Sequence, residues 1–388
     1  MDFLILSVTA GEGHNSTARA IRTSLEARDA SAEILDTLEY VSPELAKIIA
    51  DGYLLVTERA QGAYRVGYQL AEKRKTREKT DRIQIAATNL FSKELIEYIR
   101  SGRYDAIVFT HPFAGMMCGA MKQGGLISNP TVGILTDFTF HPFWEECTAN
   151  DYVVVPDGLL LPQARRKGFR DSQVLPFGIP IDPKFSTRIP AEEARRKLGL
   201  REDLTTFLVM GGSMGYGNMD ELAARIDGVD AARDFQIIAV AGRNEEMKAS
   251  MDRLAEKSKH RLLVTGFVDY VSLLMDAADC IITKPGGLTT SESLVKNLPM
   301  IIVNPIPGQE ERNTEFLLNN GCAMATSRTA PIEECLYQLL FSDVRLDAMR
   351  TCISGVAKPG ATEDLCRFLS NLALTPHVST YGAEKTSG

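Results

Sequence analysis

The chain has 388 residues, of which 44% are hydrophobic and 24% charged, and its formal net charge is −7. This length allows two domains with separate cores, and the composition is that of a soluble globular protein. The negative charge argues against nucleic-acid binding. No basic leader precedes the first apolar run, and no apolar run approaches the length of a membrane span. Seven scattered cysteines without a Cys-x-x-Cys pair indicate thiols in a reducing compartment. We therefore expect a cytoplasmic protein.

The first apolar run, residues 3–8, is followed by the sequence TAGEGHNSTARAI. A strand, a Gly-x-Gly turn and a helix are typical of dinucleotide binding, and Asp36 lies at the spacing of the acidic residue in that fingerprint. Ser16 replaces the third glycine, however, and His14 lies at the helix start. A helix N-terminus lowers the pKa of a histidine, which leaves a neutral ring that can accept a proton. A dinucleotide loop, a catalytic base and a merely capping or buried histidine all remain open here.

Short apolar, β-rich runs alternate with helical stretches along the whole chain. Such strands, separated by helices, are typical of parallel sheets covered on both faces. We therefore expect an α/β fold with two doubly wound, Rossmann-like domains that face a shared cleft. The expected strands are residues 3–8, 32–38, 104–110, 131–137, 151–157 and 173–178, then 205–212, 235–242, 261–268, 280–287 and 300–308.

A segment rich in proline, residues 176–190, interrupts the alternation of strands and helices. Proline-rich stretches of this kind are typical of connections between domains. We therefore expect an N-terminal domain at 1–178, a linker at 179–190, a C-terminal domain at 191–370 and a polar tail at 371–388.

Residues 39–103 form a long insertion between the second and third expected strands. Its apolar residues recur at helical spacing and are followed by a basic cluster at residues 72–82. One interpretation is an amphipathic helix on the domain core with a solvated charged end. The other is that residues 44–82 contact an anionic membrane surface, where each basic residue gains about 1 kcal/mol.

The second half of the chain has a glycine turn, Pro285-Gly286-Gly287, between a strand and a helix. The helix opens with Thr289 and Thr290, and its free N–H groups and hydroxyls suit an anion. Glu292, in the same first turn, can accept hydrogen bonds from both hydroxyls of a ribose. An acidic residue at this position is also favourable with the helix dipole alone.

Three further strand ends in this half carry candidate ligand contacts. The first is a second glycine-rich loop, which suits an anion. The second is a turn that offers backbone groups and an apolar face to a nucleotide base. The third strand end carries two hydrogen-bonding side chains that can hold sugar hydroxyls. The residues are Gly212, Ser213 and Met214 in the loop, Phe267 and Val268 in the turn, and Gln309 and Glu310 at the last strand end.

The sequence strand-PGG-T-x-x-x-E, followed by strand-P-x-x-x-QEE, resembles the donor half of GT-B nucleotide-sugar glycosyltransferases. In particular it is similar to monogalactosyldiacylglycerol synthases and the related processive diacylglycerol glucosyltransferases. The G-x-G-H-x-x-x-A loop at residues 11–18 and the insertion also resemble that family, and the likeness extends to about residue 370. The resemblance implies that the N-terminal domain binds a lipid acceptor and the C-terminal domain binds a UDP-sugar.

The resemblance implies an inverting hexosyltransferase that moves glucose or galactose from a UDP-sugar to the hydroxyl of diacylglycerol. The enzyme would work at the inner face of the cell membrane as a peripheral protein, with no cofactor besides the donor substrate. The roles implied are general base for His14, diphosphate binding for Ser213 and residues 285–290, ribose binding for Glu292, and sugar binding for Gln309 and Glu310.

Other candidate acceptor residues come after strand ends of the first half, where ligands of such sheets bind. Gly13 opens space beside His14, and His111 and His141 each come just after a strand. Asp137 can orient or support the base. Trp144, the only tryptophan, either lines the acceptor site or packs in the core.

The chain contains no Asp-x-Asp sequence, the usual carboxylate pair for a divalent metal on a nucleotide diphosphate. A helix N-terminus and glycine-rich N–H groups can stabilise departing UDP instead. We therefore expect metal-independent displacement, with His14 as the base. The alternatives are a UDP-N-acetylglucosamine-dependent transferase with another lipid acceptor, a UDP-sugar epimerase, a nicotinamide dehydrogenase and a non-catalytic UDP-sugar binder.

Overall fold

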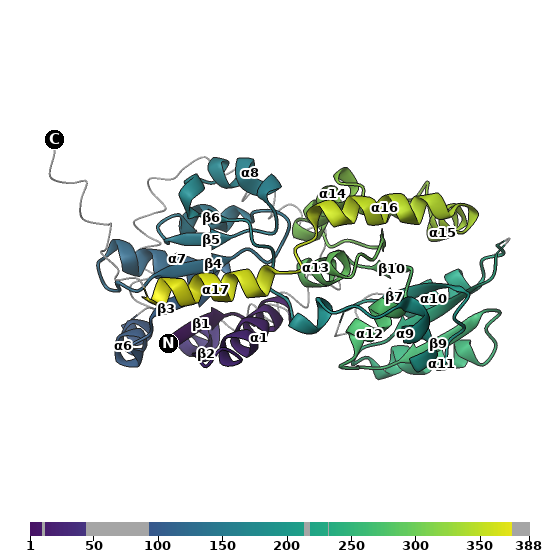
Figure 1. The fold of residues 1–388 in the computed structure, drawn as a ribbon, viewed down its shortest axis with the longest axis horizontal. Coiled ribbons are helices and arrows are strands. Elements are labelled where there is room, and N and C mark those ends of the chain that lie inside the picture. The colour runs from purple at the N-terminus through teal and green to yellow at the C-terminus, as the bar shows by residue number, and fades with distance from the viewer. Residues whose placement is uncertain (10–11, 44–92, 213–217, 232, 375–388) are drawn as a thin grey trace. The chain divides into compact units, whose positions relative to one another are not determined.

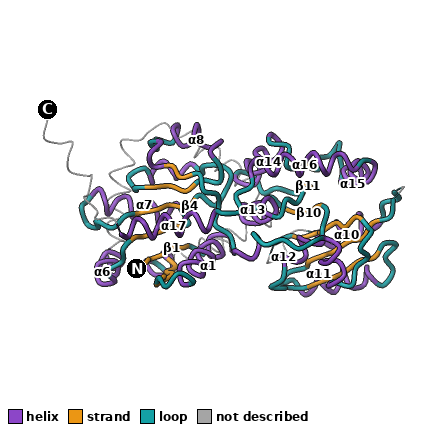
Figure 2. Tube along the Cα trace, viewed as in Figure 1, coloured by secondary structure: helices purple, strands orange, loops and turns teal. Residues whose placement is uncertain are grey.

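The computed structural model describes residues 1–9, 12–43, 93–212, 218–231 and 233–374 (Figure 1). The chain forms two units: unit 1 comprises residues 1–183 and 360–388, and unit 2 comprises residues 184–359. Each unit is a parallel six-stranded sheet flanked by helices (Figure 2). The predicted α/β class with two doubly wound sheets is confirmed.

The sheet of unit 1 has the strand order β2-β1-β3-β4-β5-β6, and every neighbouring pair is parallel. Its strands are β1 (Asp2–Ser7), β2 (Ser31–Asp36), β3 (Ala106–Phe109), β4 (Thr131–Ile134), β5 (Tyr152–Val154) and β6 (Val174–Leu175). The helices are α1 (Glu12–Glu26), α2 (Thr37–Val41), α6 (Lys93–Gly102), α7 (Pro112–Gln123), η1 (Pro142–Cys147), η2 (Gly158–Leu160), α8 (Leu161–Arg166), η3 (Asp171–Gln173) and α17 (Ala361–Leu374). Because the strands are parallel, the loops after them lie at one edge of the sheet, which is called its carboxyl edge below.

The sheet of unit 2 has the order β12-β11-β10-β7-β8-β9 and is also parallel throughout. Its strands are β7 (Thr205–Met210), β8 (Phe235–Val240), β9 (Arg261–Thr265), β10 (Cys280–Thr283), β11 (Met300–Ile302) and β12 (Ala323–Ala325). Helix η4 (Pro183–Phe185) lies at the boundary of the units. The other helices are α9 (Ala191–Lys197), α10 (Met219–Asp227), α11 (Glu245–Ala255), α12 (Val271–Ala277), α13 (Gly287–Val295), α14 (Gln309–Asn319), α15 (Ile332–Phe341) and α16 (Asp343–Val356).

The predicted end of the C-terminal domain at residue 370 is wrong. Helix α17 packs against α1 in the core of unit 1 (Figure 1), where Leu365 and Leu369 are fully buried. Thr362 donates a hydrogen bond to the carbonyl of Ile181, and Arg28 forms an ion pair with Glu363. The same helix continues to Leu374, beyond the predicted start of the tail. The chain therefore returns to unit 1, where the apolar face of α17 completes the core formed by α1 and the sheet.

The predicted linker at 179–190 is likewise divided between the two units, with the boundary after Pro183. Its second part is fastened to unit 2. Lys296, whose side chain is fully buried, donates to the carbonyl of Thr187 at 2.6 Å and to both oxygens of Asp276 at 2.8 Å. Arg188 donates to the carbonyl of Val295. The first part of the connection is hydrogen-bonded to unit 1 through Ile181, and the second part to unit 2.

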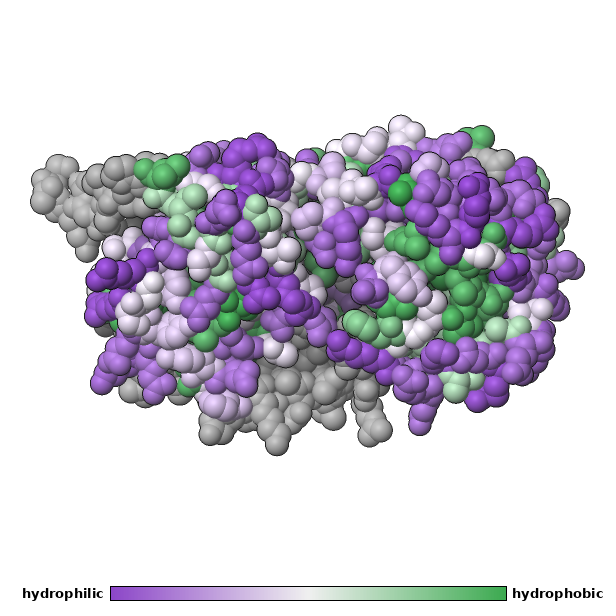
Figure 3. Space-filling model, turned by 60° about the horizontal axis from the view of Figure 1, so that its bottom comes forward, coloured by the Kyte–Doolittle hydropathy of each residue, from purple (hydrophilic) through white to green (hydrophobic). Residues whose placement is uncertain are grey.

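Residues 44–92, and with them the proposed membrane contact at 44–82, lie outside the described residues. No helix in the described part of the chain has the length and apolar character needed to cross a membrane. The face of the molecule drawn in Figure 3 is hydrophilic over most of its described area, with separate apolar patches.

Candidate active site

Three segments at the carboxyl edge of unit 1, the first of them the opening turn of α1, bring His14, His111 and Thr136 together. They come after β1, β3 and β4, which are neighbours in the sheet. Nδ1 of His14 lies 2.7 Å from the carbonyl oxygen of Thr110 and 3.3 Å from Oγ1 of Thr136. The rings of His14 and His111 have centroids 4.8 Å apart and stand at 80° to each other. Two of the predicted acceptor-side residues are thus in direct ring contact.

The hydrogen bond to Thr110 fixes the tautomer of His14. A carbonyl oxygen only accepts, so Nδ1 of His14 must carry the proton and donate it. In the neutral ring, Nε2 is then left with its lone pair. This is the arrangement required of a general base, because the nitrogen that accepts the substrate proton must be unprotonated.

The pKa of His14 is lowered from its ordinary value, mainly because the ring is buried. The negative charge of Asp137 and the hydrogen bond to Thr110 act in the opposite direction and raise the pKa. The sequence predicted the same direction but attributed it to the helix N-terminus, whereas burial is the main cause. His14 is consequently neutral at neutral pH.

His111 and His141 both cap the start of a helix. Nδ1 of His111 accepts a hydrogen bond from the backbone N–H of Phe113 at 3.1 Å, and Nδ1 of His141 accepts one from Phe143 at 3.3 Å. Burial lowers the pKa of His111 well below the ordinary value, and the nearby His14 and His141 add to this. Burial, with the charge of Lys167, lowers the pKa of His141 to about 4. Both rings are neutral at physiological pH.

Trp144 is a core residue, so its prediction as an acceptor contact is wrong. Its side chain is 2% exposed. The ring centroid lies 6.1 Å from that of Phe109 and 6.1 Å from that of Phe140. Gly133 on β4 makes room for this cluster, because a Cβ there would meet both Phe109 and Trp144. Of the two interpretations of Trp144, packing in the core is therefore the correct one.

A chain of hydrogen bonds joins Thr9 and Asn15, on either side of the turn before His14, to neighbouring strand ends. Thr110 donates to Ser7 at 3.3 Å, Ser7 donates to Asn15 at 2.5 Å, and Asn15 donates to Thr9 at 3.0 Å. The Thr9 hydroxyl donates to Asp36 at 2.5 Å. Each side chain in this chain donates a hydrogen bond to the next one, and the last acceptor is the Asp36 carboxylate. It connects the ends of β3, β1 and β2 to the first turn of α1.

Asp36 is occupied by the protein and not presented to a ribose. One carboxylate oxygen accepts from the N–H and hydroxyl of Thr9, and the other accepts from the N–H groups of Leu38 and Glu39. The dinucleotide interpretation requires this carboxylate for a ribose hydroxyl. The structure therefore disfavours the nicotinamide dehydrogenase.

Gly13 lies in the first turn of α1, where a Cβ would meet no atom within 4 Å. Its backbone does not adopt a positive φ. Among the described residues, neither packing nor backbone conformation requires a glycine at this position.

The β10–α13 turn is the clearest anion-binding element of unit 2. Gly286 precedes the first helical residue, has φ −63°, and would place a Cβ in open space. The N–H of Thr290 already donates to the carbonyl of Gly286, and its side chain is 1% exposed. Thr290 is therefore not available to a ligand, contrary to prediction. The N–H groups of Gly287, Leu288 and Thr289 are the ones that a helix leaves without intrahelical partners.

Helix α14 is tied to this turn. Asn313, fully buried, donates to the carbonyl of Pro285 at 2.9 Å. One carboxylate oxygen of Glu310 accepts from the N–H of Ile306 at 2.7 Å, so this side chain partly serves its own turn. Gln309 and Glu310, the predicted sugar contacts, begin α14, and Glu292 is half-buried on α13. Because β10 and β11 are neighbours, these two turns lie side by side at the carboxyl edge of unit 2.

The remaining donor candidates lie after β7 and β9. Gly212 has φ +83°, a left-handed conformation that favours glycine. Ser213 and Met214 lie outside the described residues. Phe267 is 55% exposed, Val268 is half-buried beside it, and the Arg243 guanidinium lies 4.5 Å from the Phe267 ring centroid. This cation–π contact holds the exposed Phe267 ring against a side chain from the loop after β8.

Sequence reasoning missed Asn15, Thr136, Arg243, Leu288 and Asn313. Asn15 and Asn313 act through hydrogen bonds to distant strands and turns, which no local sequence pattern reveals. Leu288 contributes a backbone N–H, which is independent of its side chain. Arg243 comes after β8. Its position after a strand end was the only sequence feature that could have indicated a ligand contact.

A family model for monogalactosyldiacylglycerol (MGDG) synthase matches residues 14–181, and one for the glycosyltransferase family 28 C-terminal domain matches residues 206–358. The first part of the chain thus matches the MGDG synthase model and the second part matches a glycosyltransferase model, so the chain is a glycosyltransferase. The resemblance found in its sequence is thus confirmed. This glycosyltransferase is 29% identical to a processive diacylglycerol beta-glucosyltransferase of Bacillus pumilus over 349 residues, which are 89% of its own chain and 88% of the relative.

Solved structures show that the glycosyltransferase has the GT-B fold. MurG of Acinetobacter baumannii matches with a TM-score of 0.62 at 15% identity, over 95% of this chain and 99% of that one. UDP-GlcNAc 2-epimerase of Neisseria meningitidis matches with a TM-score of 0.57 at 11% identity, over 96% of this chain and all of that one (100%). The fold is therefore shared with an epimerase, and the family models, not the fold, make the chain a transferase.

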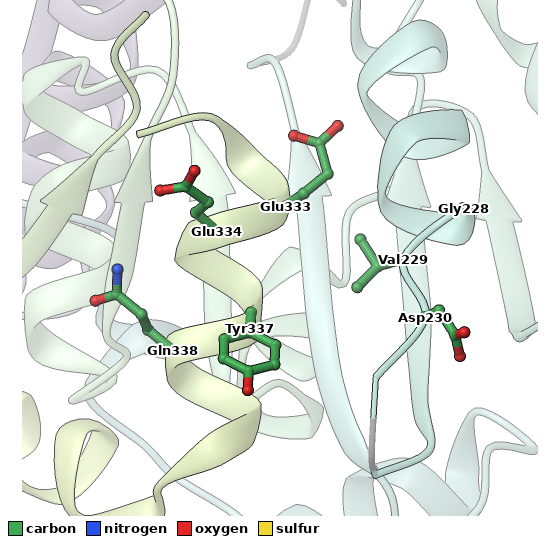
Figure 4. Close-up of a pocket in the computed structure, with 7 residues that line it drawn as sticks. All are labelled: Gly228, Val229, Asp230, Glu333, Glu334, Tyr337 and Gln338. Atoms are coloured by element: carbon green, nitrogen blue, oxygen red, sulfur yellow. The ribbon is translucent and has the colours of Figure 1, made fainter. Parts of the chain in front are cut away.

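A separate pocket lies between α15 and the loop after α10 (Figure 4). Tyr337, Gln338 and two glutamates line one side, and Val229 and Asp230 the other. The loop after α10 leads into β8, so it lies at the amino end of that strand. Arg225 pairs with Glu333 at 2.7 Å beside it. This pocket is thus at the edge opposite the donor candidates and has no part in their site.

Proposed function

We propose that this glycosyltransferase moves glucose from UDP-glucose to the hydroxyl of diacylglycerol, with inversion at the anomeric carbon. The observation that carries the proposal is the tautomer of His14, which leaves an unprotonated Nε2 at the carboxyl edge of the acceptor-side sheet. The choice of lipid and sugar is supported by the name of the Bacillus relative, a processive diacylglycerol beta-glucosyltransferase. Galactose is the alternative hexose suggested by the N-terminal family model.

In the proposed reaction, the hydroxyl oxygen of diacylglycerol attacks C1 of glucose while the bond from C1 to the diphosphate oxygen breaks. Nε2 of His14 takes the hydroxyl proton as the new bond forms. The products are the glycolipid, UDP and a protonated His14, which then returns its proton to water. The negative charge of Asp137 raises the pKa of His14 and so stabilises the imidazolium.

The leaving diphosphate would be stabilised by the N–H groups at the start of α13, with no metal required. Preorganised N–H groups at a helix N-terminus favour developing negative charge. Gly286 leaves space for the phosphate to approach. Glu292 would hold the ribose, Phe267 and Val268 would face the base, and Gln309 and Glu310 would hold the sugar.

We also propose that the enzyme works as a peripheral protein at the inner face of the cell membrane. The support is the basic cluster at residues 72–82 and the lipid nature of the proposed acceptor. Binding to vesicles with anionic lipids, but not to neutral ones, is the expected result. Equal binding to both would contradict a role for residues 44–82.

The lipid product formed from each UDP-sugar tests the proposed function. Purified enzyme is incubated with UDP-glucose, UDP-galactose or UDP-N-acetylglucosamine and diacylglycerol in mixed micelles, and the lipids are extracted and analysed by mass spectrometry and NMR. A β-linked hexosyl-diacylglycerol is expected. An α-linkage would contradict inversion, and sugar conversion without lipid would favour the epimerase. Donor binding without any product would favour a non-catalytic UDP-sugar binder, and a product with N-acetylglucosamine alone would change the donor.

A further inference from the structure

We propose that His111 holds the acceptor hydroxyl for His14 by donating a hydrogen bond from its Nε2 to the hydroxyl oxygen. This inference rests on the proposed function and deepens it, because it assigns an atom to the acceptor side of the reaction. His111 would be a second residue in contact with the reacting hydroxyl, with a role different from that of the base.

The first step of the argument is the proton position on His111. Its Nδ1 accepts a hydrogen bond from the N–H of Phe113, so Nδ1 is the nitrogen with the lone pair. The ring is neutral because it is buried beside another histidine. The single ring proton must then lie on Nε2, which can donate but cannot accept. The helix cap of α7 thus fixes the chemical character of the other ring nitrogen.

The second step is that His14 has the opposite tautomer. Its Nδ1 donates to Thr110, so its Nε2 accepts. The two rings are in edge contact, with centroids 4.8 Å apart. Within the described residues, no protein group forms a hydrogen bond with Nε2 of either ring. A ring with an acceptor nitrogen and a ring with a donor nitrogen are therefore in contact just after the neighbouring strands β1 and β3.

The third step is the chemistry of a hydroxyl group, which donates one hydrogen bond and accepts others. A hydroxyl seated on this pair donates its proton to His14 and accepts a hydrogen bond from His111. In that arrangement the hydroxyl proton points toward Nε2 of His14, and the second lone pair of the oxygen remains available to attack C1 of glucose. A neutral donor suits this task better than a charged one, because a positive His111 would repel the imidazolium that forms on His14.

Two substitutions separate this role from the structural one. Asparagine is a good helix N-cap, but its side chain is too short to reach the position of Nε2. Glutamine places an amide N–H near the position of Nε2 but is a poor cap. His111→Asn should therefore keep the cap and lose the donor, and His111→Gln should keep the donor and lose the cap.

The measurements are the thermal midpoint of unfolding and the steady-state rate of UDP release, with diacylglycerol and UDP-glucose varied in turn. For His111→Asn we expect a midpoint near that of the wild type and a kcat/KM for diacylglycerol that falls about tenfold, as for one lost hydrogen bond. The KM for UDP-glucose should not change. For His111→Gln we expect a lower midpoint and a kcat/KM above that of His111→Asn.

A folded His111→Asn enzyme with wild-type kcat/KM would overturn the inference, and so would a folded His111→Gln enzyme slower than His111→Asn. If His111→Gln does not fold, the Asn variant alone decides. A wild-type enzyme that transfers nothing to diacylglycerol would overturn the proposed function, and this inference with it. Wild-type transfer with an unaffected His111→Asn enzyme would overturn the inference alone.

Discussion

The carboxyl edges of the two sheets are built differently. In unit 1, buried imidazoles are fixed in defined tautomers by backbone carbonyl and N–H groups, so the chemistry is carried by side chains. In unit 2, the corresponding edge presents glycine turns and the start of α13, so the main contribution comes from backbone N–H groups. Proton transfer requires a titratable group, whereas a diphosphate requires only fixed positive dipoles. In the proposed function, the same fold serves these two tasks through different loops at the ends of its strands.

The largest effect is expected from removing the base of unit 1. His14→Ala should reduce kcat roughly 10²- to 10⁴-fold, the usual contribution of a positioned base. UDP binding should be unchanged, because the proposed donor contacts lie in unit 2. Steady-state UDP release and calorimetric UDP titration measure the two quantities. A variant that releases UDP as fast as the wild type would remove His14 from the mechanism.

A smaller effect is expected from filling the space in unit 2. Gly286→Ala adds a Cβ that meets no protein atom, so folding should change little, while the approach of the diphosphate is obstructed. UDP affinity should fall roughly tenfold, or about 1.4 kcal/mol. Gly355→Ala, whose Cβ also meets no protein atom, is the matched control and should leave UDP affinity unchanged. Equal UDP affinity in the two variants would argue against a diphosphate site at α13.

The hydrogen-bond chain beside His14 should contribute less than the base. Leucine is branched at Cγ like asparagine but has no polar side-chain atoms, so Asn15→Leu can neither accept from Ser7 nor donate to Thr9. We expect kcat to fall roughly fivefold to tenfold, with UDP affinity unchanged, because the positioning of His14 is loosened. Ser16→Ala is the control, since the Ser16 hydroxyl accepts a hydrogen bond from the exposed Arg19 and takes no part in the chain. If both substitutions have the same effect on kcat, the chain does not position the base.

The smallest effect concerns pH. The rate should fall on acidification only below the ordinary pKa of histidine, because burial lowers the pKa of His14 and protonation destroys the base. Asp137→Asn removes a negative charge that raises this pKa, so the acid limb of the profile should move to still lower pH. The pH dependence of kcat/KM for both proteins measures the shift. A move to higher pH would contradict the assigned electrostatics.

Much of the fold was predictable because strands buried on both faces carry near-continuous apolar runs. All eleven expected strands are present, and β12 was missed because Ala-Met-Ala carries no β-branched or aromatic residue. The return of α17 to unit 1 was not predictable, since an amphipathic pattern does not identify the core on which a helix packs.

Only those site residues that come directly after an expected strand could be predicted from the sequence. His14, His111 and the PGG turn stand after apolar runs, where parallel sheets place ligands. The tautomers of the two histidines depend on Thr110 and Phe113, and their effect appears only with three-dimensional contacts. Trp144 illustrates the converse, because a residue close in sequence to a candidate histidine can still face the core.

The most direct test of lipid glycosylation is the dependence of UDP release on the acceptor. Wild-type enzyme is given UDP-glucose in detergent micelles with increasing amounts of diacylglycerol, and released UDP is measured over time. We predict slow release without diacylglycerol and a saturable increase as diacylglycerol is added. UDP release that is the same at every diacylglycerol content would contradict the assignment of this lipid as the acceptor.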